Sequence, residues 1–332
     1  MKELLELLPK LRGKRIGVYG DLIADEYVYG TIHRFSREAP VFIVNYEEAQ
    51  IGLGGAANAI NNIHALGGIP YPLGVLGNDH PGRTLLAVMK EKGIPTEGIV
   101  SDYSHPTFVK QRIVAGSPHS VRQQILRLDR CVVLPNDAAC HANLQDRLKT
   151  VMGKLDALIV SDYGLGVANP LKMEETLAEV ERKGIPVFVD SRQRIPSFKH
   201  VTAATPNEPE VESLIGKVLE GESLIEAGNE LLQRFGMKAL LITRGKNGMA
   251  LFTRDSAPAM IPIFGSTNIV DVTGAGDTVI STFTLAVTSG ASFYDAARLA
   301  NCAAGITVMK RGAATVTIEE LSEAIRVATM HQ

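Results

Sequence analysis

The sequence predicts an α/β fold: a central, mainly parallel β-sheet flanked by helices, with a small separate β layer over one end. From about residue 54 onward, short β-branched runs alternate with longer helical patterns, and this alternation is typical of a parallel sheet covered on both faces. Two stretches, about 25–51 and 105–128, instead alternate polar and apolar residues without helices between them. We expect these stretches to form a lid, with an extension of the main sheet as the alternative.

The elements of the main sheet follow from local patterns. The expected strands are short apolar runs at 15–20, 71–77, 157–164, 186–191 and 239–245. Apolar residues at helical spacing predict helices at 81–92, 170–183, 222–235, 275–289, 292–309 and 317–329. Gly93 and Gly184 are typical helix stops. The first fifteen residues predict an exposed amphipathic helix rather than a signal peptide, because acids interrupt their short apolar stretch.

Composition narrows the class of protein. The chain has 332 residues, of which 45% are hydrophobic and 21% charged, and we expect one domain covering 1–332. A net charge of -2 argues against nucleic acid or an anionic membrane surface as a partner. Three scattered cysteines are too few for a disulfide framework or a zinc site. These features indicate a cytoplasmic globular enzyme or binding protein.

The most specific string is Asp271-Val-Thr-Gly-Ala-Gly-Asp277, which runs directly into a helical pattern. Its glycines predict a tight loop whose amides lead into a helix N-terminus, where partial positive charge suits a phosphate or a developing oxyanion. Asp277 could accept a proton from a substrate hydroxyl. The alternative is a plain helix cap. Two acids around a Gly-Ala-Gly loop are more than a cap requires, so we favour the catalytic interpretation.

Other nucleotide and hydrolase motifs are absent or weak. The sequence contains neither G-x-x-x-x-G-K-[ST] nor G-x-S-x-G. The stretch Gly52–Ala57 formally fits the dinucleotide fingerprint. However, no buried strand precedes it and no acidic residue follows at the required distance, so we reject an oxidoreductase.

The Asp271–Asp277 string resembles the C-terminal signature of the ribokinase (phosphofructokinase B) carbohydrate kinases, and Gly54–Asn58 resembles their N-terminal signature. The resemblance implies a ribokinase-like fold and an ATP-dependent sugar kinase with Asp277 as catalytic base. It also implies that the amides of Gly274, Ala275 and Gly276 hold the developing charge. A catalytically inactive sensor of sugar phosphate or nucleotide is the alternative from another class.

Shorter motifs in the family's order imply further roles. The sugar-binding candidates are Asp25, Gly54, Gly55 and Asn58. The resemblance assigns ATP to Asn207, Thr243, Gly245, Gly248 and Asn301, and Mg²⁺ to Asn207 and Glu210, most simply through water. A K⁺ site is implied at Asp271, Thr273 and Gly312. By themselves, Asn207-x-x-Glu210 is also a helix-start pattern and 243–248 also a hairpin turn.

Three further segments resemble the kinases that phosphorylate the anomeric hydroxyl of heptose 7-phosphate. They are Arg34–Val41, Gln124–Asp129 and Ser161–Gly164. The basic candidates for the substrate phosphate are Arg34, Lys110, Arg112, Arg127 and Arg192. Arg37, Leu165 and Ser191 depart from the expected pattern, so ribose, 2-keto-3-deoxygluconate or a hexose phosphate remains the alternative acceptor. We expect homodimers formed through the lids, because lids expose sheet edges.

Overall fold

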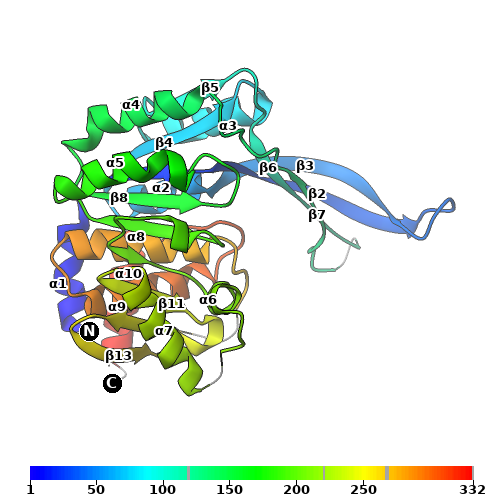
Figure 1. Ribbon diagram of the computed structural model, residues 1–332. Coiled ribbons are helices and arrows are strands. Elements are labelled where there is room, and N and C mark those ends of the chain that lie inside the picture. Colours follow the sequence, from blue (N-terminus) through cyan, green and yellow to red (C-terminus); the bar gives the residue numbers. More distant parts are fainter. Residues whose placement is uncertain (118–119, 220, 266–268, 331–332) are drawn as a thin grey trace.

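The computed structural model describes residues 1–117, 120–219, 221–265 and 269–330, which form two separate sheets (Figure 1). The larger sheet has nine strands in the order β13-β12-β11-β10-β9-β8-β1-β4-β5. Neighbouring strands are parallel from β5 through β11, and β12 and β13 are antiparallel. The predicted α/β class with a mainly parallel sheet is therefore confirmed.

The five expected runs match β1, β4, β8, β9 and β11 of the larger sheet closely, whereas its other four strands were not expected. Their bounds are β1 Arg15–Gly20, β4 Ile69–Gly77, β5 Ile99–Asp102, β8 Ala157–Asp162, β9 Val187–Ser191, β10 Ala203–Ala204, β11 Ala239–Thr243, β12 Met249–Thr253 and β13 Ser256–Ile261. All six residues of β8 are buried, which explains why its sequence is nearly continuous in apolar residues.

Helices cover both faces of this sheet, and their buried side chains fall into two hydrophobic clusters. One face carries α1 Lys2–Leu11, α2 Ala56–Ala65, α3 His80–Glu91, α8 Ala275–Thr288, α9 Phe293–Thr307 and α10 Ile318–Met330. The other carries α4 Cys140–Met152, α5 Pro170–Arg182, α6 Glu208–Ile215 and α7 Glu222–Arg234. None of the helices in the described part of the chain is long and apolar enough to cross a membrane.

The N-terminal helix α1 is amphipathic, as its sequence predicts, but it is less exposed than expected. Leu4, Leu7, Leu8 and Leu11 are at most 6% exposed and belong to the core cluster that contains α8, α9 and α10. The apolar face of α1 therefore closes one side of the molecule.

The four-stranded sheet has the order β3-β2-β6-β7 and extends away from the body of the molecule (Figure 1). Its strands are β2 Leu22–Phe35, β3 Phe42–Gly55, β6 Phe108–Gly116 and β7 Gln123–Arg130. The two alternating stretches thus form a β layer of their own, as we favoured, and do not extend the main sheet. We call this layer the small sheet.

The order of the strands in the larger sheet changes direction at β1, and the loops of several strands gather at this position. β1 lies between β4 and β8, and the chain builds the sheet outward from it on both sides. Open α/β sheets bind ligands at such a switch point, beyond the carboxyl ends of the strands. The loops after β1, β8 and β9 all meet there.

Candidate active site

Asp277 lies in the first turn of α8 and is 3% exposed. Asn58 Nδ2 donates a hydrogen bond to Asp277 Oδ2 at 2.9 Å. The hydroxyl of Tyr163 donates to Asp277 Oδ1 at 2.8 Å. Each carboxylate oxygen thus has a donor, and the orientation of the side chain is fixed.

Burial raises the pKa of Asp277 from 3.8 to about 6, although the hydrogen bonds from Asn58 and Tyr163 act to lower it. A carboxyl group in this range is mostly ionised at neutral pH and is a stronger base than an exposed aspartate. A carboxylate with this pKa is compatible with the proton-accepting role expected for Asp277.

The loop before α8 needs glycine at position 274. Gly274 has φ 79°, and a Cβ there would lie 2.4 Å from Asn58 Nδ2. The amide of Ala275 donates to Val272 O at 3.2 Å, so one of the three amides expected to hold charge already closes the turn. The Gly274 and Gly276 amides are the remaining candidates.

The glycines of the N-terminal motif leave room for the side chain of Asp25. A Cβ at Gly54 would lie 2.7 Å from Asp25 Cγ, and Gly55 has φ 57° at the start of α2. Asp25 is 4% exposed and forms an ion pair with Arg112, whose Nη1 is 2.6 Å from Asp25 Oδ1. Asp25 and Asn58, the two side chains expected to bind the sugar, thus both lie near Asp277, and Arg112 lies beside Asp25.

Two of the expected cations lie against Tyr163, a residue to which the sequence assigned no role of its own. Lys110 Nζ and Arg192 Cζ each lie 4.8 Å from the centroid of the Tyr163 ring. Burial and the neighbouring Arg192 lower the pKa of Lys110. The position of Tyr163, directly after the buried strand β8, was the signal that could have identified it.

The other basic candidates lie farther from Asp277. Arg127 is on β7, opposite Arg112 in the strand pairing, and its half-exposed side chain pairs with Asp129 at 2.9 Å. Arg34 is exposed near the outer end of β2, nine residues beyond Asp25. Neither is brought to the carboxylate of Asp277.

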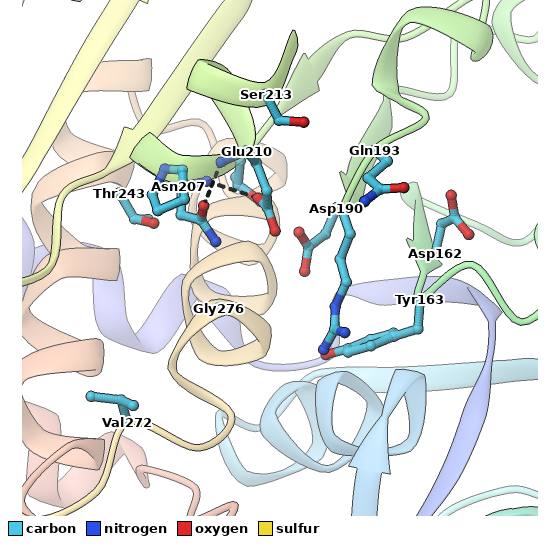
Figure 2. Close-up of a pocket in the computed structure, with 13 residues that line it drawn as sticks. Asp162, Tyr163, Asp190, Gln193, Asn207, Glu210, Ser213, Thr243, Val272 and Gly276 are labelled. Atoms are coloured by element: carbon cyan, nitrogen blue, oxygen red, sulfur yellow. Dashed lines mark hydrogen bonds between the residues drawn. The ribbon is translucent and has the colours of Figure 1, made fainter. Parts of the chain in front are cut away.

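A cavity of about 550 Å³ lies next to Gly276, in the first turn of α8. The carboxyl groups of Asp190 and Glu210 point into it (Figure 2). Burial, together with Asp277 and Glu210, raises the pKa of Asp190 well above its ordinary value. Burial also raises the pKa of Glu210. A cation in this cavity would relieve the repulsion between the carboxylates.

A second cavity of about 520 Å³ adjoins the first, and its lining is mainly apolar. The two share Asn207, Pro209, Thr243, Val272 and Gly276. Together they form a groove with an apolar part and a polar part, and the first turn of α8 lies where the two parts meet. This combination suits a nucleotide, whose base is flat and apolar and whose phosphates carry charge.

Asn207 and Glu210 form the helix cap that was the alternative interpretation. Asn207 Oδ1 accepts from the Glu210 amide at 2.8 Å, and Glu210 Oε2 accepts from the Asn207 amide at 2.9 Å (Figure 2). Both residues still line the polar cavity. No group of three or more His, Cys, Asp and Glu in the described ranges could hold a metal ion. A Mg²⁺ ion here would therefore depend on phosphate and water ligands.

The 243–248 segment is a hairpin turn between β11 and β12 and also lines the apolar cavity. A Cβ at Gly248 would lie 2.1 Å from Ile261 O. Asn301, on α9, donates from Nδ2 to Pro262 O at 2.7 Å and lines the same cavity. The expected ATP residues are thus together in space.

The residues expected at a K⁺ site also converge. Asp271 Oδ1 accepts from the Thr273 amide at 2.9 Å, and Asp271 Oδ2 accepts from the Gly312 amide at 2.9 Å. Asp271 therefore ties the loop before α8 to the loop after α9.

The sequence model of a protein family, described as pfkB family carbohydrate kinase, matches residues 15–320. The chain belongs to this family. The kinase expected from the two glycine motifs is thereby confirmed, and ATP is the phosphoryl donor that such a kinase uses. The pfkB assignment also agrees with a groove whose two parts meet at the first turn of α8.

Among curated proteins, this pfkB chain is 36% identical over 329 residues to Bifunctional protein HldE of Pelobacter propionicus, covering 98% of the chain and 66% of the relative. It is 38% identical over 306 residues to the protein of the same name from Geobacter sulfurreducens, covering 92% and 61%. The chain therefore spans less than two thirds of the length of these relatives.

Solved structures show the same ribokinase-like fold. Phosphofructokinase-2 from Escherichia coli in complex with potassium has a TM-score of 0.76 at 14% identity, covering 96% of this chain and 99% of that one. Arabidopsis thaliana ribokinase complexed with ribose and ATP has a TM-score of 0.73 at 20% identity, covering 95% and 99%.

Proposed function

We propose that this kinase phosphorylates the anomeric hydroxyl of D-glycero-D-manno-heptose 7-phosphate, with Asp277 as general base. The observation that carries the base assignment is the position of Asp277. Its buried carboxylate lies in the first turn of α8, where it is hydrogen-bonded to Asn58 and next in sequence to Gly276, which lines both cavities of the groove.

In the proposed mechanism, Asp277 accepts the proton of the acceptor hydroxyl as that oxygen attacks the γ-phosphorus of ATP. The P–O bond to ADP breaks as the new P–O bond forms. The amides of Gly274 and Gly276, at the positive end of α8, stabilise the charge on the transferring phosphoryl group. The carboxylate is ready for this role because two donors already fix its orientation.

We place the adenine end of ATP in the apolar cavity near Asn301 and Gly248, and the phosphates in the polar cavity. Mg²⁺ would lie between the phosphates and Glu210, reached through water, and would neutralise phosphate charge. The residues present fit such an ion because two carboxyl groups face the cavity. A K⁺ ion near Asp271, Thr273 and Gly312 is part of the same proposal.

The heptose assignment rests on sequence resemblance, and the basic residues near the site support a phosphorylated acceptor. Lys110, Arg112 and Arg192 are the cations close enough to meet such an acceptor in this structure. The relatives at 36–38% identity, whose name is Bifunctional protein HldE, are consistent with this choice.

The test is ADP formation with MgATP and a panel of sugars and sugar phosphates. We expect selective turnover of heptose 7-phosphate, lost by a factor of about 10²–10⁴ in Asp277→Asn. Turnover of ribose, 2-keto-3-deoxygluconate or a hexose phosphate instead would refute the heptose assignment and keep the kinase. Folded protein that binds ATP but turns over no sugar would indicate a sensor.

We further propose that the small sheet is a lid that belongs to the same kinase unit as the rest of chain 1–332. It excludes water when the sugar is bound. Two such lids would form the interface of a homodimer. In β6, Lys110 and Arg112 face Asp25, so the alternating Gln111 and Ile113 face away. The cytoplasmic location expected from the sequence stays a prediction.

A further inference from the structure

Tyr163 follows β8 and donates its hydroxyl to Asp277 Oδ1 at 2.8 Å. We propose that Tyr163 is a positioning residue, whose hydroxyl orients Asp277 and whose ring fixes two cations beside it. The cations are Lys110 and Arg192, each 4.8 Å from the ring centroid. The inference rests on the proposed role of Asp277 as base and adds a residue through which that base is controlled.

The backbone of Tyr163 is held rigidly. The fully buried carboxylate of Asp21 accepts the amides of Tyr163 at 2.8 Å, Leu165 at 3.1 Å and Val167 at 3.0 Å. These bonds fix the loop after β8 against Asp21, which lies between β1 and β2. The backbone from which the Tyr163 ring projects toward Asp277 is therefore held in place.

The cations reach the ring from two different parts of the fold. Lys110 comes from β6 in the small sheet, and Arg192 follows β9 in the main sheet. An aromatic ring attracts cations to its negative face, which offsets part of the repulsion between two like charges. Tyr163 thus connects the small sheet to the main sheet at the point where phosphoryl oxygens would carry charge.

The charged groups facing Asp277 come from three directions. Asp25 and Lys110 belong to the small sheet, Tyr163 follows β8, and Asp190 and Arg192 lie at the end of β9. Asp25 acts to raise the pKa of Asp277, and Lys110 to lower it. Loss of the Tyr163 hydroxyl alone would remove one donor from the carboxylate and leave every charge in place. The pKa of Asp277 would then rise, because its ionised form is less well hydrogen-bonded.

The experiment is the pH dependence of kcat, from pH 5 to 9, with MgATP and the sugar that the wild type accepts. In Tyr163→Phe we expect the midpoint of the acidic limb to rise by about one pH unit. The KM for the sugar should change less than about twofold, because the ring and the cations remain. Tyr71→Phe, near the amino end of β4 and so away from the carboxyl ends of the strands, is the control and should match the wild type.

The ring is tested by pentafluorophenylalanine at position 163, which keeps the shape of phenylalanine but reverses the charge on the ring face. Relative to Tyr163→Phe, we expect the KM for the sugar or for ATP to rise by about threefold to tenfold. Melting temperatures of all variants report on folding.

An unchanged acidic limb in Tyr163→Phe, even with a lowered melting temperature, would overturn the orienting role. Equal KM values for phenylalanine and its fluorinated analogue would overturn the role of the ring. If instead the proposed function is wrong, the wild type will turn over no sugar, or Asp277→Asn will remain active.

Discussion

At the scale of single residues, Asp277 combines burial with two hydrogen-bond donors. Burial disfavours its charged form, while Asn58 and Tyr163 favour it. The pKa of about 6 is the balance of these effects. Behind Asn58, Asn62 Nδ2 donates to Asn58 Oδ1 at 3.3 Å, and Thr278 Oγ1 donates to Asn62 Oδ1 at 3.1 Å. The base is therefore held by a chain of buried polar side chains.

This balance predicts that the ionised carboxylate of Asp277 lowers the free energy of unfolding at neutral pH. Since the folded-state pKa is raised from 3.8 to about 6, the folded protein binds the proton more tightly. Stability falls as pH rises from about 4 through about 6 and stays lower above that range. Asp277→Asn should remove this loss and raise the free energy of unfolding at pH 8 by about 1–3 kcal/mol.

Urea unfolding of wild type and Asp277→Asn at pH 5 and pH 8 measures this difference. Asp255→Asn, in the exposed turn between β12 and β13, is the matched control and should follow the wild type. If the free energy of unfolding differs between wild type and Asp277→Asn by the same amount at pH 5 and at pH 8, the prediction is wrong.

The acidic limb of the pH–rate profile gives a second prediction for this residue. Because the base must be ionised, kcat should fall as pH drops below about 6, where Asp277 becomes protonated. A pH–rate profile with saturating MgATP and sugar measures it. Activity that continues unchanged to pH 4.5 would show that Asp277 is not the base.

At the scale of elements, the starts of two helices and one hairpin turn shape the nucleotide groove. α8 begins at the Gly274 turn, and α6 begins with the Asn207–Glu210 cap. The two residues that cap α6, Asn207 and Glu210, also line the polar cavity, whereas α8 begins at Gly274 without a side-chain cap. Capping of α6 therefore leaves Asn207 and Glu210 in a position to meet a ligand, and the two interpretations of Asn207-x-x-Glu210 are compatible.

The geometry of the hairpin between β11 and β12 predicts that alanine destabilises the fold less at Gly245 than at Gly248. Gly245 has φ 53° and Gly248 has φ 78°, so alanine is strained at both. A Cβ at Gly245 meets nothing within 4 Å, whereas at Gly248 it would lie 2.1 Å from Ile261 O. We expect Gly245→Ala to cost about 1 kcal/mol of folding free energy, and Gly248→Ala at least about 1–3 kcal/mol more.

Thermal unfolding compares the two variants, and the KM for ATP reports on the groove. Gly248→Ala should raise this KM, because its turn lines the apolar cavity and must shift. Two variants with equal melting temperatures would mean that the backbone around Ile261 adapts at no cost.

At the scale of the whole molecule, the small sheet presents an apolar face away from the site. Leu126 and Leu128 of β7 are 58% and 50% exposed, and they pair with Ile113 and Gln111. Exposed apolar side chains on a projecting sheet are typical of an interface.

We predict that the lids form the contact of a homodimer. Light scattering after size exclusion should give twice the 35.7 kDa mass of the chain at micromolar concentration. Leu126→Lys combined with Leu128→Lys should give the monomer, because charge would be buried at the contact. Leu171→Lys, at an 82% exposed position on α5, is the control. A monomeric wild type would refute the prediction.

Local sequence predicted much of the fold. The run 15–20 coincides with β1, and 239–245 contains β11, because β-branched runs bounded by glycine or polar residues favour strands regardless of distant contacts. Asp277, Asn58 and Asp25 were expected in one site because their motifs are contiguous and resemble those of the family, and the structure brings the three side chains close together. The roles that depend on contact, such as that of Tyr163, could not be predicted in this way.

The amino-acid sequence by itself determined the alternation of strands and helices, the glycine turns and the acid that follows them. These depend on backbone preferences and on periodicity within a few residues. Folding decided which distant side chains meet. It placed Lys110 and Arg192 on the ring of Tyr163, left Arg127 on an outer strand, and engaged the Ala275 amide within its own turn. Lys110 and Arg192 lie tens of positions from Tyr163 in the sequence, and only the packing of the two sheets brings them within a few ångströms of its ring.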